Sequence, residues 1–371
     1  MCGICGELRV DGRQPDAARL GRMLARLEQR GPDHEGRYLA DNLAMGHRRL
    51  SVIDLSAASN QPWVDEALGL ALVFNGAIYN YKELRAELQS KGFSFCSEGD
   101  TEVVLKAYAA WGTAFAERLH GMFAIALWDK RQQQLVLVRD RFGIKPLYYS
   151  HNRDCIRFAS TTQALLAAGD VDCSIDPVAL HHHFTLHAVV PAPRTLLKGV
   201  RKLPPAHIMV VNSDGHDRVF PYWELNAAPS VRPQSEGEWL EVTREALYKA
   251  VERRRVIADV PVGVLLSGGL DSSLLVALLA EHGGNDLRTF SVGFEDHPDE
   301  SGSEFEFSDQ VVERYGTKHE KIHVPNEHVL ERLPEVIDQM SEPMVGQDAV
   351  AFYLLSEQVS RYVKVVQSGQ G

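Results

Sequence analysis

The sequence has few cysteines, no long apolar run and no excess of basic residues. No apolar run approaches the roughly 20 residues that a helix needs to cross a bilayer. The first residues, 1–12, lack the basic start and the apolar core of a signal peptide. Five cysteines, an odd number in 371 residues, do not form a disulfide framework. These absences argue against membrane proteins and small disulfide-bonded secreted domains, and they predict a cytoplasmic protein.

Acidic residues outnumber basic ones, with 50 Asp and Glu against 39 Lys and Arg and a formal net charge of -11. A general nucleic-acid-binding surface would need a basic excess, so this balance argues against one. Small anionic ligands remain compatible with the charge, because local amides and a few cations can bind them. We therefore expect small molecules as partners, and neither nucleic acid nor membrane. The oligomeric state is open, and a homodimer is one of the alternatives.

The length and the changing pattern of apolar residues predict two domains. Residues 2–224 alternate strand-like runs such as LALVFNG with helix-like stretches such as YKELRAELQSKG, which indicates an α+β domain. A polar, proline-containing stretch over 225–238 is the predicted linker. From 239 to 371, strand and helix alternate as in a doubly wound parallel α/β sheet. Because such a domain should not stop at VKVVQSGQG, we expect it to be incomplete.

The chain begins with MCGICG, which places Cys2 directly behind the initiator methionine and Cys5 three residues later. A Cys-x-x-C pair can bind zinc or form a redox disulfide, but zinc would normally require a second pair of ligands. A second interpretation depends on position, since removal of Met1 would give Cys2 a free α-amine. The pKa of that amine is about 8 and that of a thiol about 8.5, so one residue could supply both nucleophile and general base. Cys5 would then be a small buried thiol.

Seven motifs occur in the order seen in class II glutamine amidotransferase domains, whose nucleophile is an N-terminal cysteine. They are MCGICG, RGPDHEG, GHRRLSVIDL, NQPW, FNGAIYNY, GDTEVVLKAY and DRFGIKPLYY. The chain most resembles the glutaminase domain of the asparagine synthetase family, from residue 2 to about 210. The resemblance implies an N-terminal-nucleophile fold, an αββα sandwich, and a glutamine-hydrolysing carbon–nitrogen ligase.

The resemblance also implies roles for individual residues. Cys2 would attack the side-chain amide of glutamine, and Asn75 with the Gly76 N–H would form the oxyanion hole, where two donors meet developing negative charge. Arg49 would pair with the α-carboxylate of glutamine, and Asp100 would hold its α-ammonium. The remaining implied glutamine-binding residues are Leu50, Ser51, Val52, Ile53 and Ala77. The family commonly has glutamate where this chain has alanine, so one contact to the ammonium is missing.

A second motif, VGVLLSGGLDSSLLVALLAEHG, runs from a buried strand through Ser-Gly-Gly into a helix. Free glycine N–H groups and the helix N-terminus predict a phosphate site. The motif lacks the Gly-Lys-Ser/Thr ending of a Walker A loop, and it is not a Gly-x-Ser-x-Gly elbow. It resembles the pyrophosphate loop of N-type ATP pyrophosphatases, which implies ATP and Mg²⁺ as cofactors and Asp271 as the metal contact. The implied ATP-binding residues are Leu265, Leu266, Ser267, Gly268, Gly269, Asp271, Ser272, Ser273, Val292, Ser368 and Gly369.

The end of the chain reads SGQG where asparagine synthetases usually have Ser-Gly-Glu-Gly, so Gln370 replaces the glutamate associated with forming the acyl-adenylate. SEPMVGQDAVAFYLLSE, QSGQG and HHHFTLHAVVPAPRT are similar to the bacterial branch that amidates N-acetylglutaminylglutamine. The resemblance implies a glutamine-dependent, ATP-consuming amide synthetase. It would transfer ammonia to an acyl-adenylate of that dipeptide or of aspartate, releasing AMP and pyrophosphate.

Two other interpretations remain open, a glutaminase-only or regulatory nucleotide-binding protein and a Cys-x-x-C metal or redox protein. His183 and His187 have the i, i+4 spacing with which a helix can bind a metal. No His-Glu-x-x-His pattern accompanies them, so we expect these histidines on a helix surface.

Overall fold

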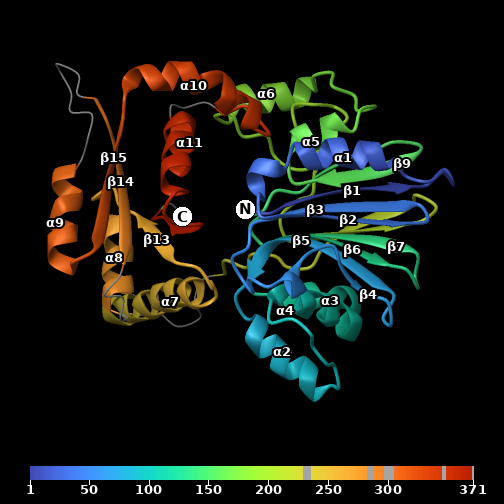
Figure 1. Ribbon diagram of the computed structural model, residues 1–371, viewed down its shortest axis with the longest axis horizontal. Helices are drawn as coiled ribbons and strands as arrows, with labels where there is room; N and C mark the ends of the chain where they lie inside the picture. The colour runs from blue at the N-terminus through green and yellow to red at the C-terminus, as the bar shows by residue number, and fades with distance from the viewer. Residues whose placement is uncertain (229–234, 282–286, 296–304, 345–347, 370–371) are drawn as a thin grey trace. The chain divides into compact units, whose positions relative to one another are not determined.

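The computed structural model describes residues 1–228, 235–281, 287–295, 305–344 and 348–369 (Figure 1). The chain divides into two compact units. The first comprises residues 1–226 together with 341–343, and the second comprises residues 227–340 together with 344–371. The polypeptide therefore passes from one unit to the other three times.

Two six-stranded antiparallel sheets form the first unit. Their strands are β1 (Gly3–Arg9), β2 (His34–Ala40), β3 (Leu43–Arg49), β4 (Trp63–Asp65), β5 (Leu70–Ile78), β6 (Gly121–Asp129), β7 (Gln134–Arg139), β8 (Tyr148–His151), β9 (Cys155–Ala159), β10 (Arg201–Lys202), β11 (His207–Asn212) and β12 (Asp217–Pro221). One sheet has the order β10-β8-β9-β1-β3-β2, and the other has the order β12-β11-β7-β6-β5-β4.

Helices cover the outer faces of both sheets (Figure 1). The helices of this unit are α1 (Ala17–Ala25), α2 (Tyr81–Ser90), α3 (Asp100–Trp111), α4 (Phe115–Arg118), α5 (Thr162–Ala167) and α6 (Pro177–Thr185). Helices α1 and α5 pack on the first sheet, and α3 packs on the second with α2 and α4 against it. This layering confirms the predicted αββα sandwich.

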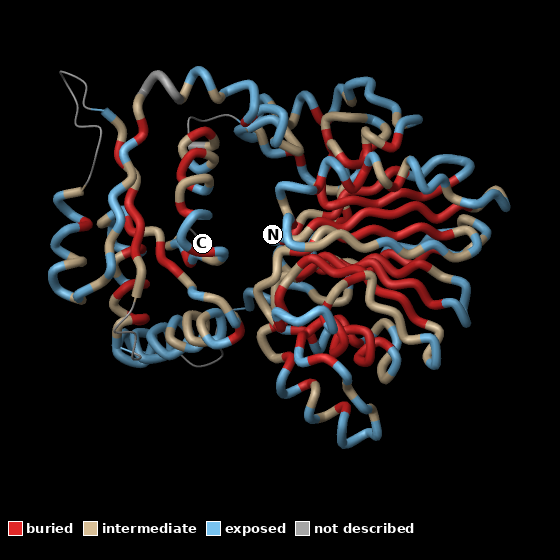
Figure 2. The backbone as a smooth tube through the Cα atoms, viewed as in Figure 1, coloured by how far each residue is buried: buried red, intermediate tan, exposed pale blue. Residues whose placement is uncertain are grey.

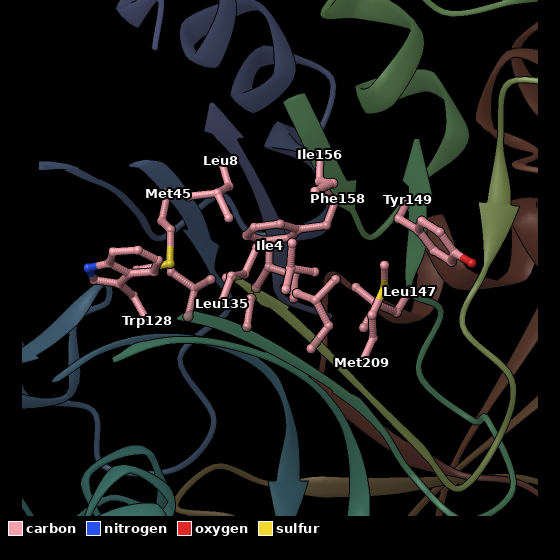
Figure 3. Packing of buried hydrophobic residues seen from close by; sticks show 14 of the residues in the cluster. Ile4, Leu8, Met45, Trp128, Leu135, Leu147, Tyr149, Ile156, Phe158 and Met209 are labelled. Atoms are coloured by element: carbon pink, nitrogen blue, oxygen red, sulfur yellow. The ribbon is translucent and has the colours of Figure 1, made fainter. Parts of the chain in front are cut away.

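The main core lies between the two sheets. Ile4 and Leu8 of β1 extend into it, and Figure 3 shows them with Phe158 of β9 and with Trp128 and Met209 of the other sheet. Because helices cover the outer faces as well, most strands of this unit are buried along their length (Figure 2). Such double coverage explains why the strands read as continuous apolar runs in the sequence.

The outer face of β1 packs beneath helix α1. Asp16 caps this helix by accepting a hydrogen bond from the Ala18 N–H at 2.8 Å. Leu20 and Leu24, one turn apart, lie on the buried face of the helix and share a core cluster with Cys5. Cys5 is therefore a fully buried thiol in the packing between helix and sheet.

A buried ion pair joins β1 to its neighbour β9. The Arg157 Nε donates to Glu7 Oε2 at 2.5 Å, and both side chains are at most 5% exposed. Arg19 of α1 donates to the same Glu7 oxygen at 3.2 Å, and Arg157 also donates to the Gly169 carbonyl at 3.0 Å. Two guanidinium groups thus share the Glu7 carboxylate, although Arg19 also pairs with the exposed Asp170 at 3.2 Å.

We expect Glu7→Ala to destabilise the first unit by about 3–5 kcal/mol, because it leaves the Arg157 charge buried without its partner. The matched control is Glu87→Ala, which breaks the exposed Glu87–Arg118 pair and should cost about 0.5 kcal/mol or less. Urea denaturation followed by tryptophan fluorescence, to which Trp128 in the core of this unit contributes, measures both. Equal midpoints for the two variants would contradict the importance of the buried pair.

The segment Ser341–Pro343 is held within the first unit by polar contacts. The Thr162 hydroxyl donates to the Ser341 carbonyl at 2.6 Å. The Lys202 ammonium forms an ion pair with Glu342 at 2.6 Å, and both side chains are less than 20% exposed.

A four-stranded parallel sheet forms the centre of the second unit. Its strands, in the order β15-β14-β13-β16, are β13 (Val262–Leu265), β14 (Arg288–Phe294), β15 (Lys318–Val324) and β16 (Val365–Gln367). Its helices are α7 (Glu236–Val256), α8 (Leu270–Glu281), α9 (Phe305–Tyr315), α10 (Asn326–Gln339) and α11 (Asp348–Val359). Val264 and Val276 of α8 share one core cluster, and Phe290 and Leu355 of α11 share another. Helices therefore cover both faces, which confirms the doubly wound parallel sheet.

Helix α7 begins inside the stretch predicted as a linker. Ser235 and Glu238 form a capping box at its start, in which the Ser235 hydroxyl accepts from the Glu238 N–H at 3.3 Å. None of its described residues is buried, as Figure 2 shows.

Within the described ranges, no helix combines the length and the apolar character that crossing a membrane requires.

Candidate active site

The pairing of β1 with β3 determines where Cys2 lies. Gly3 is opposite Arg48 in this antiparallel pair, so the register brings Cys2 to the level of Arg49, the last residue of β3, and next to Leu50. The Leu50 N–H donates to Cys2 Sγ at 3.4 Å, and the thiol is 3.7 Å from the Leu50 carbonyl. Burial raises the pKa of the thiol, while the Leu50 hydrogen bond opposes this rise. A buried thiol of this kind needs an adjacent base before it can act as a nucleophile.

Strand β5 supplies a buried donor that has no partner. Asn75 is 1% exposed, and its side-chain Nδ2 has no hydrogen-bond partner in the part of the chain that the structure describes. Buried polar groups are normally paired, so an unpaired amide is typical of a ligand site. The next residue must be glycine, since a Cβ on Gly76 would lie 2.2 Å from the Met122 carbonyl of β6.

A buried histidine connects β3 to the strand of Asn75. His47 Nε2 lies 3.2 Å from the Phe74 carbonyl, and burial lowers the pKa of this imidazole to about 3. His47 is therefore neutral, and its ring N–H can donate to the carbonyl that precedes Asn75. This contact keeps the Asn75 backbone next to the strand that ends at Arg49.

Asp100 is the first residue of α3 and is buried beside the end of β5. Its Oδ2 accepts a hydrogen bond from the Ile78 N–H at 3.0 Å, and the residue is 5% exposed. Burial raises the pKa of this carboxyl to about 6. Asp100 and Arg49 both act electrostatically on the Cys2 thiol, so the fold brings these three predicted residues into one neighbourhood.

Arg49 is buried, but its guanidinium is already occupied by protein oxygens. Its Nη1 donates to the Ser56 carbonyl at 2.8 Å and to Asn60 Oδ1 at 2.7 Å. Its Nη2 donates to the carbonyls of Ile53 and Asp54. These bonds hold the loop that follows β3. A bidentate pair with the α-carboxylate of glutamine would require some of them to be exchanged, and that role stays a prediction.

The other predicted glutamine-binding residues lie around the same strand ends. Leu50, Ser51, Val52 and Ile53 form a half-buried loop after β3, and the Ser51 N–H donates to Asp33 Oδ2 at 2.7 Å. Ala77 is buried in β5, opposite Met122. Its uncharged methyl group cannot form an ion pair with the α-ammonium of glutamine.

From the predicted role of Asp100 we expect Asp100→Asn to raise the KM for glutamine about 100-fold with a smaller effect on kcat, because the substitution removes the charge that would pair with the α-ammonium. The parental KM should also rise as the pH falls through 6, where Asp100 becomes protonated. Steady-state glutaminase kinetics at several pH values measure both effects.

The same variant has an opposite effect on stability. The folded-state pKa of Asp100 exceeds that of an unfolded chain, so its ionisation destabilises the fold as the pH rises through 6. Asp100→Asn removes this cost and should stabilise the protein at pH 7.5 by about 1–3 kcal/mol. A destabilised variant would show instead that Asp100 has mainly a structural role.

The second unit has a pocket at the carboxyl ends of its parallel strands. Its volume is about 250 Å³, and it is lined by Leu265, Leu266, Ser267, Gly269, Leu270, Asp271, Ser272, Phe290, Ser291, Val292, Phe352, Leu355, Ser368 and Gly369. Open parallel sheets bind ligands at this edge, outside the carboxyl ends of the strands.

The loop between β13 and α8 is tightly organised. The Ser267 hydroxyl oxygen accepts from the Gly269 N–H at 3.3 Å and lies 3.1 Å from the Ser272 hydroxyl. Gly268 has a φ of +87°, and a Cβ there would lie 2.5 Å from that of Phe307. A Cβ on Gly369 would lie 2.8 Å from the Ser272 nitrogen. The backbone after β16 thus approaches the start of α8 as closely as glycine allows.

Most, but not all, of the predicted ATP-binding residues line this pocket. Gly268 instead borders a separate hollow with Phe307 and Arg314, and Ser273 lies on α8 outside the lining. Asp271 is exposed and makes no ion pair within the described residues. The predicted acyl-adenylate residue, Gln370, lies outside the described residues.

The residues present are compatible with ATP and Mg²⁺. Mg²⁺ prefers oxygen ligands and commonly binds through one or two carboxylates together with substrate phosphates. Asp271 could supply such a carboxylate next to the start of a helix, where phosphates are stabilised. In the described ranges, no group of three or more His, Cys, Asp or Glu side chains could hold a metal ion on protein ligands alone.

The predicted i, i+4 pair of histidines is not formed on one helix. Helix α6 ends at Thr185, so His183 lies on the helix and His187 lies beyond its end with a φ of +52°. The leucine that follows Thr185 is the C-cap, and the helical spacing cannot continue through it.

Sequence reasoning missed several residues around both sites. Arg30 and Lys145 lie next to Cys2 and were visible in the motifs RGPDHEG and DRFGIKPLYY, but nothing in the sequence showed that their charges are buried. In the second unit, Phe290, Ser291 and Phe352 line the pocket. These residues come from different elements that only the fold brings together.

The fold and the site define the class of protein, an N-terminal-nucleophile amidotransferase unit joined to a nucleotide-binding-type α/β unit. Residues 1–223 match the family model of a glutamine amidotransferase domain, and residues 242–371 match that of asparagine synthase. The chain belongs to the family of glutamine-hydrolysing asparagine synthetases, which confirms the resemblance seen in its motifs.

Individual relatives give the same result. Over 374 residues the chain is 34% identical to asparagine synthetase (glutamine-hydrolyzing) 1 of Bacillus subtilis, with 100% of this chain and 58% of that protein covered. It is 32% identical over 400 residues to putative asparagine synthetase (glutamine-hydrolyzing) 2 of Methanocaldococcus jannaschii, covering 100% and 74%. The chain thus spans about three fifths of the length of the Bacillus protein.

A solved structure is also similar to the chain. It is a glutamine phosphoribosylpyrophosphate amidotransferase from B. subtilis complexed with ADP and GMP, with a TM-score of 0.47 and 15% identity. The match covers 89% of this chain and 92% of that one.

Proposed function

We propose that the chain is a glutamine-dependent amide synthetase, which hydrolyses glutamine in the first unit and forms an acyl-adenylate in the second. The observation that carries the proposal is the buried amide of Asn75, which has no partner among the described residues. It lies on β5, whose Ile78 N–H bonds to Asp100, one of the groups that act on the Cys2 thiol. The proposal divides the chain into a glutaminase domain over 2–224, a linker over 225–238 and an ATP-pyrophosphatase domain over 239–371.

The glutaminase reaction follows from the residues around Cys2. After removal of Met1, the Cys2 α-amine takes the thiol proton, and the sulfur attacks the side-chain carbonyl of glutamine. Asn75 Nδ2 and the Gly76 N–H stabilise the oxyanion that develops. Collapse of this intermediate breaks the carbon–nitrogen bond, and the amine returns its proton to the departing ammonia. Water then hydrolyses the thioester to glutamate and frees the thiol.

The second unit would use the ammonia. A carboxylate acceptor attacks the α-phosphorus of ATP, which releases pyrophosphate and leaves an acyl-adenylate. Ammonia then displaces AMP and forms the amide. Ser267, Gly269 and Ser272 would hold the pyrophosphate, and Asp271 would hold Mg²⁺, which neutralises phosphate charge. Ammonia is protonated in bulk water, so a sheltered transfer is the physical reason for joining two such domains in one chain.

For the acceptor we propose N-acetylglutaminylglutamine, with aspartate as the second candidate. Support for the dipeptide comes from the segments that resemble that bacterial branch and from the alanine at position 77. The names of the relatives support aspartate. A cytoplasmic location fits the proposal, because all five cysteines are free thiols.

Cys2→Ala should abolish release of ammonium from glutamine, a loss of at least about 1,000-fold, because no other group replaces the nucleophile. Asn75→Ala should lower kcat by about 100- to 1,000-fold. The matched control is Cys96→Ala, which removes an exposed thiol of the same unit and should leave the rate unchanged. Coupled assay of ammonium and glutamate measures the rates. A Cys2→Ala protein as active as the parent would refute the proposal.

The synthetase half is tested by the products of ATP. We expect release of AMP and pyrophosphate only when a carboxylate acceptor is present, faster with N-acetylglutaminylglutamine than with aspartate. Asp271→Asn should slow this release about 100-fold and leave glutamine hydrolysis in the first unit intact. Glutaminase activity without turnover of ATP for any acceptor would favour the glutaminase-only interpretation.

A further inference from the structure

Two cations lie next to the N-terminal residues of the chain. Lys145 is only 5% exposed, and its Nζ is 2.9 Å from Met1 Sδ. The Arg30 Nε donates to the Cys2 carbonyl at 3.1 Å, and one of its terminal nitrogens, Nη2, is buried without a hydrogen-bond partner in the described residues. Neither cation forms an ion pair with a carboxylate in the part of the chain that the structure describes.

The nearby carboxylates are engaged elsewhere. Asp140 accepts hydrogen bonds from four backbone N–H groups, those of Phe123, Phe142, Ile144 and Lys145, at 2.9–3.2 Å. Asp33 accepts from the Ser51 N–H at 2.7 Å, and its charge acts on the α-amine of Met1 from the loop before β2.

Other groups face this region from the surrounding elements. Asp100 on α3 and Arg49 at the end of β3 act on the Cys2 thiol with opposite signs. Tyr148 on β8 acts electrostatically on Arg30. The groups whose charges act on the N-terminal amine are Cys2, Arg30, Lys145 and Asp33, so two cations are opposed by one thiol and one carboxylate.

This arrangement favours the neutral form of an amine. Burial, followed by Arg30 and Lys145, lowers the pKa of the Met1 α-amino group to about 6, against the opposite effects of Cys2 and Asp33. Burial and Arg30 lower the pKa of Lys145 to about 8. Lys145 therefore remains charged over the pH range in which the neighbouring amine loses its proton. The amine that processing exposes on Cys2 would lie beside the same cations.

We propose that Lys145 is a positioning residue whose charge, together with that of Arg30, keeps the N-terminal amine of the mature chain unprotonated and so ready to accept the Cys2 proton. This inference rests on the proposed function. Lys145, the lysine of DRFGIKPLYY, would act on the glutaminase reaction through its charge and not through a bond to glutamine or to the reacting sulfur. The same charge favours the thiolate of Cys2 over the thiol.

The test is the pH dependence of kcat/KM for glutamine in three variants. Lys145→Met keeps the length and apolar stem of the side chain but removes the charge, whereas Lys145→Arg keeps the charge. Lys91→Met removes an exposed lysine at the end of α2 and serves as the control. Mass spectrometry first verifies that Met1 has been removed to the same extent in every protein.

We expect the acidic limb of the profile to move up by roughly one pH unit in Lys145→Met, from the Coulomb energy of a unit charge at this range. Activity would fall about fivefold at pH 6 and approach that of the parent at pH 9, where Lys145 is neutral in the parent as well. Lys145→Arg and Lys91→Met should keep the parental profile. A loss of equal size at every pH, or an Arg variant that behaves like the Met variant, would overturn the proposal.

A second measurement separates this inference from the proposed function. The rate at which iodoacetamide alkylates Cys2, located by peptide mass, reports thiolate formation without requiring glutamine. Lys145→Met should shift this profile to higher pH as well, even if the parent proves unable to hydrolyse glutamine. An unshifted alkylation profile would refute the role of Lys145 whatever the glutaminase activity.

Discussion

The antiparallel pairing of β1 with β3 is the constraint on which the first unit depends. It places the second residue of the chain beside Leu50, at the end of β3, which is paired on both sides with β1 and the edge strand β2. A terminus is normally the least ordered part of a chain. Here the strand that begins at Gly3 is buried along its whole length, so its pairing determines where the adjacent Cys2 lies.

The same packing buries charged and polar groups of the candidate site, which costs electrostatic free energy. A carboxyl with a raised pKa and two cations that have no carboxylate partner among the described residues lie around Cys2, and the nearby strand β5 carries a buried amide that is likewise unpaired within that part of the chain. Each would be unfavourable in an ordinary core, because burial penalises polar and charged groups that lack partners. Such costs are tolerated when a ligand or a reaction uses them. The ion pair of Glu7 and Arg157, by contrast, satisfies its own charges and serves the fold.

Much of the fold could be predicted because periodicity and turn residues are local signals. The strand around LALVFNG and the helix around YKELRAELQSKG follow directly from their apolar spacing. The predicted linker over 225–238 overlaps the start of α7 at Glu236, because the polar residues of the capping box resemble a linker when they are considered without the helix. The expectation that His183 and His187 lie on one helix is wrong for a related reason, since spacing alone does not reveal that α6 ends at Thr185.

The candidate sites were only partly predictable. Motif order identified Cys2, Asn75 and Asp100, but the burial that changes the Asp100 pKa and isolates Lys145 depends on contacts between distant segments. The occupation of Arg49 by its own loop could not be seen in the sequence either. Charges and hydrogen bonds of this kind are properties of the packed molecule, whereas the motifs report only which residue types occur.

The return of Ser341–Pro343 to the first unit has a consequence for how the halves of the chain are connected. A protease that cuts once near the predicted linker would leave two fragments still joined by the Lys202–Glu342 pair and the bond to Thr162. The C-terminal fragment would carry Ser341–Pro343, which pack in the fold of the N-terminal fragment. If the two halves were expressed separately from a single boundary, the first unit would therefore lack Ser341–Pro343, and the surface that these residues cover would be exposed.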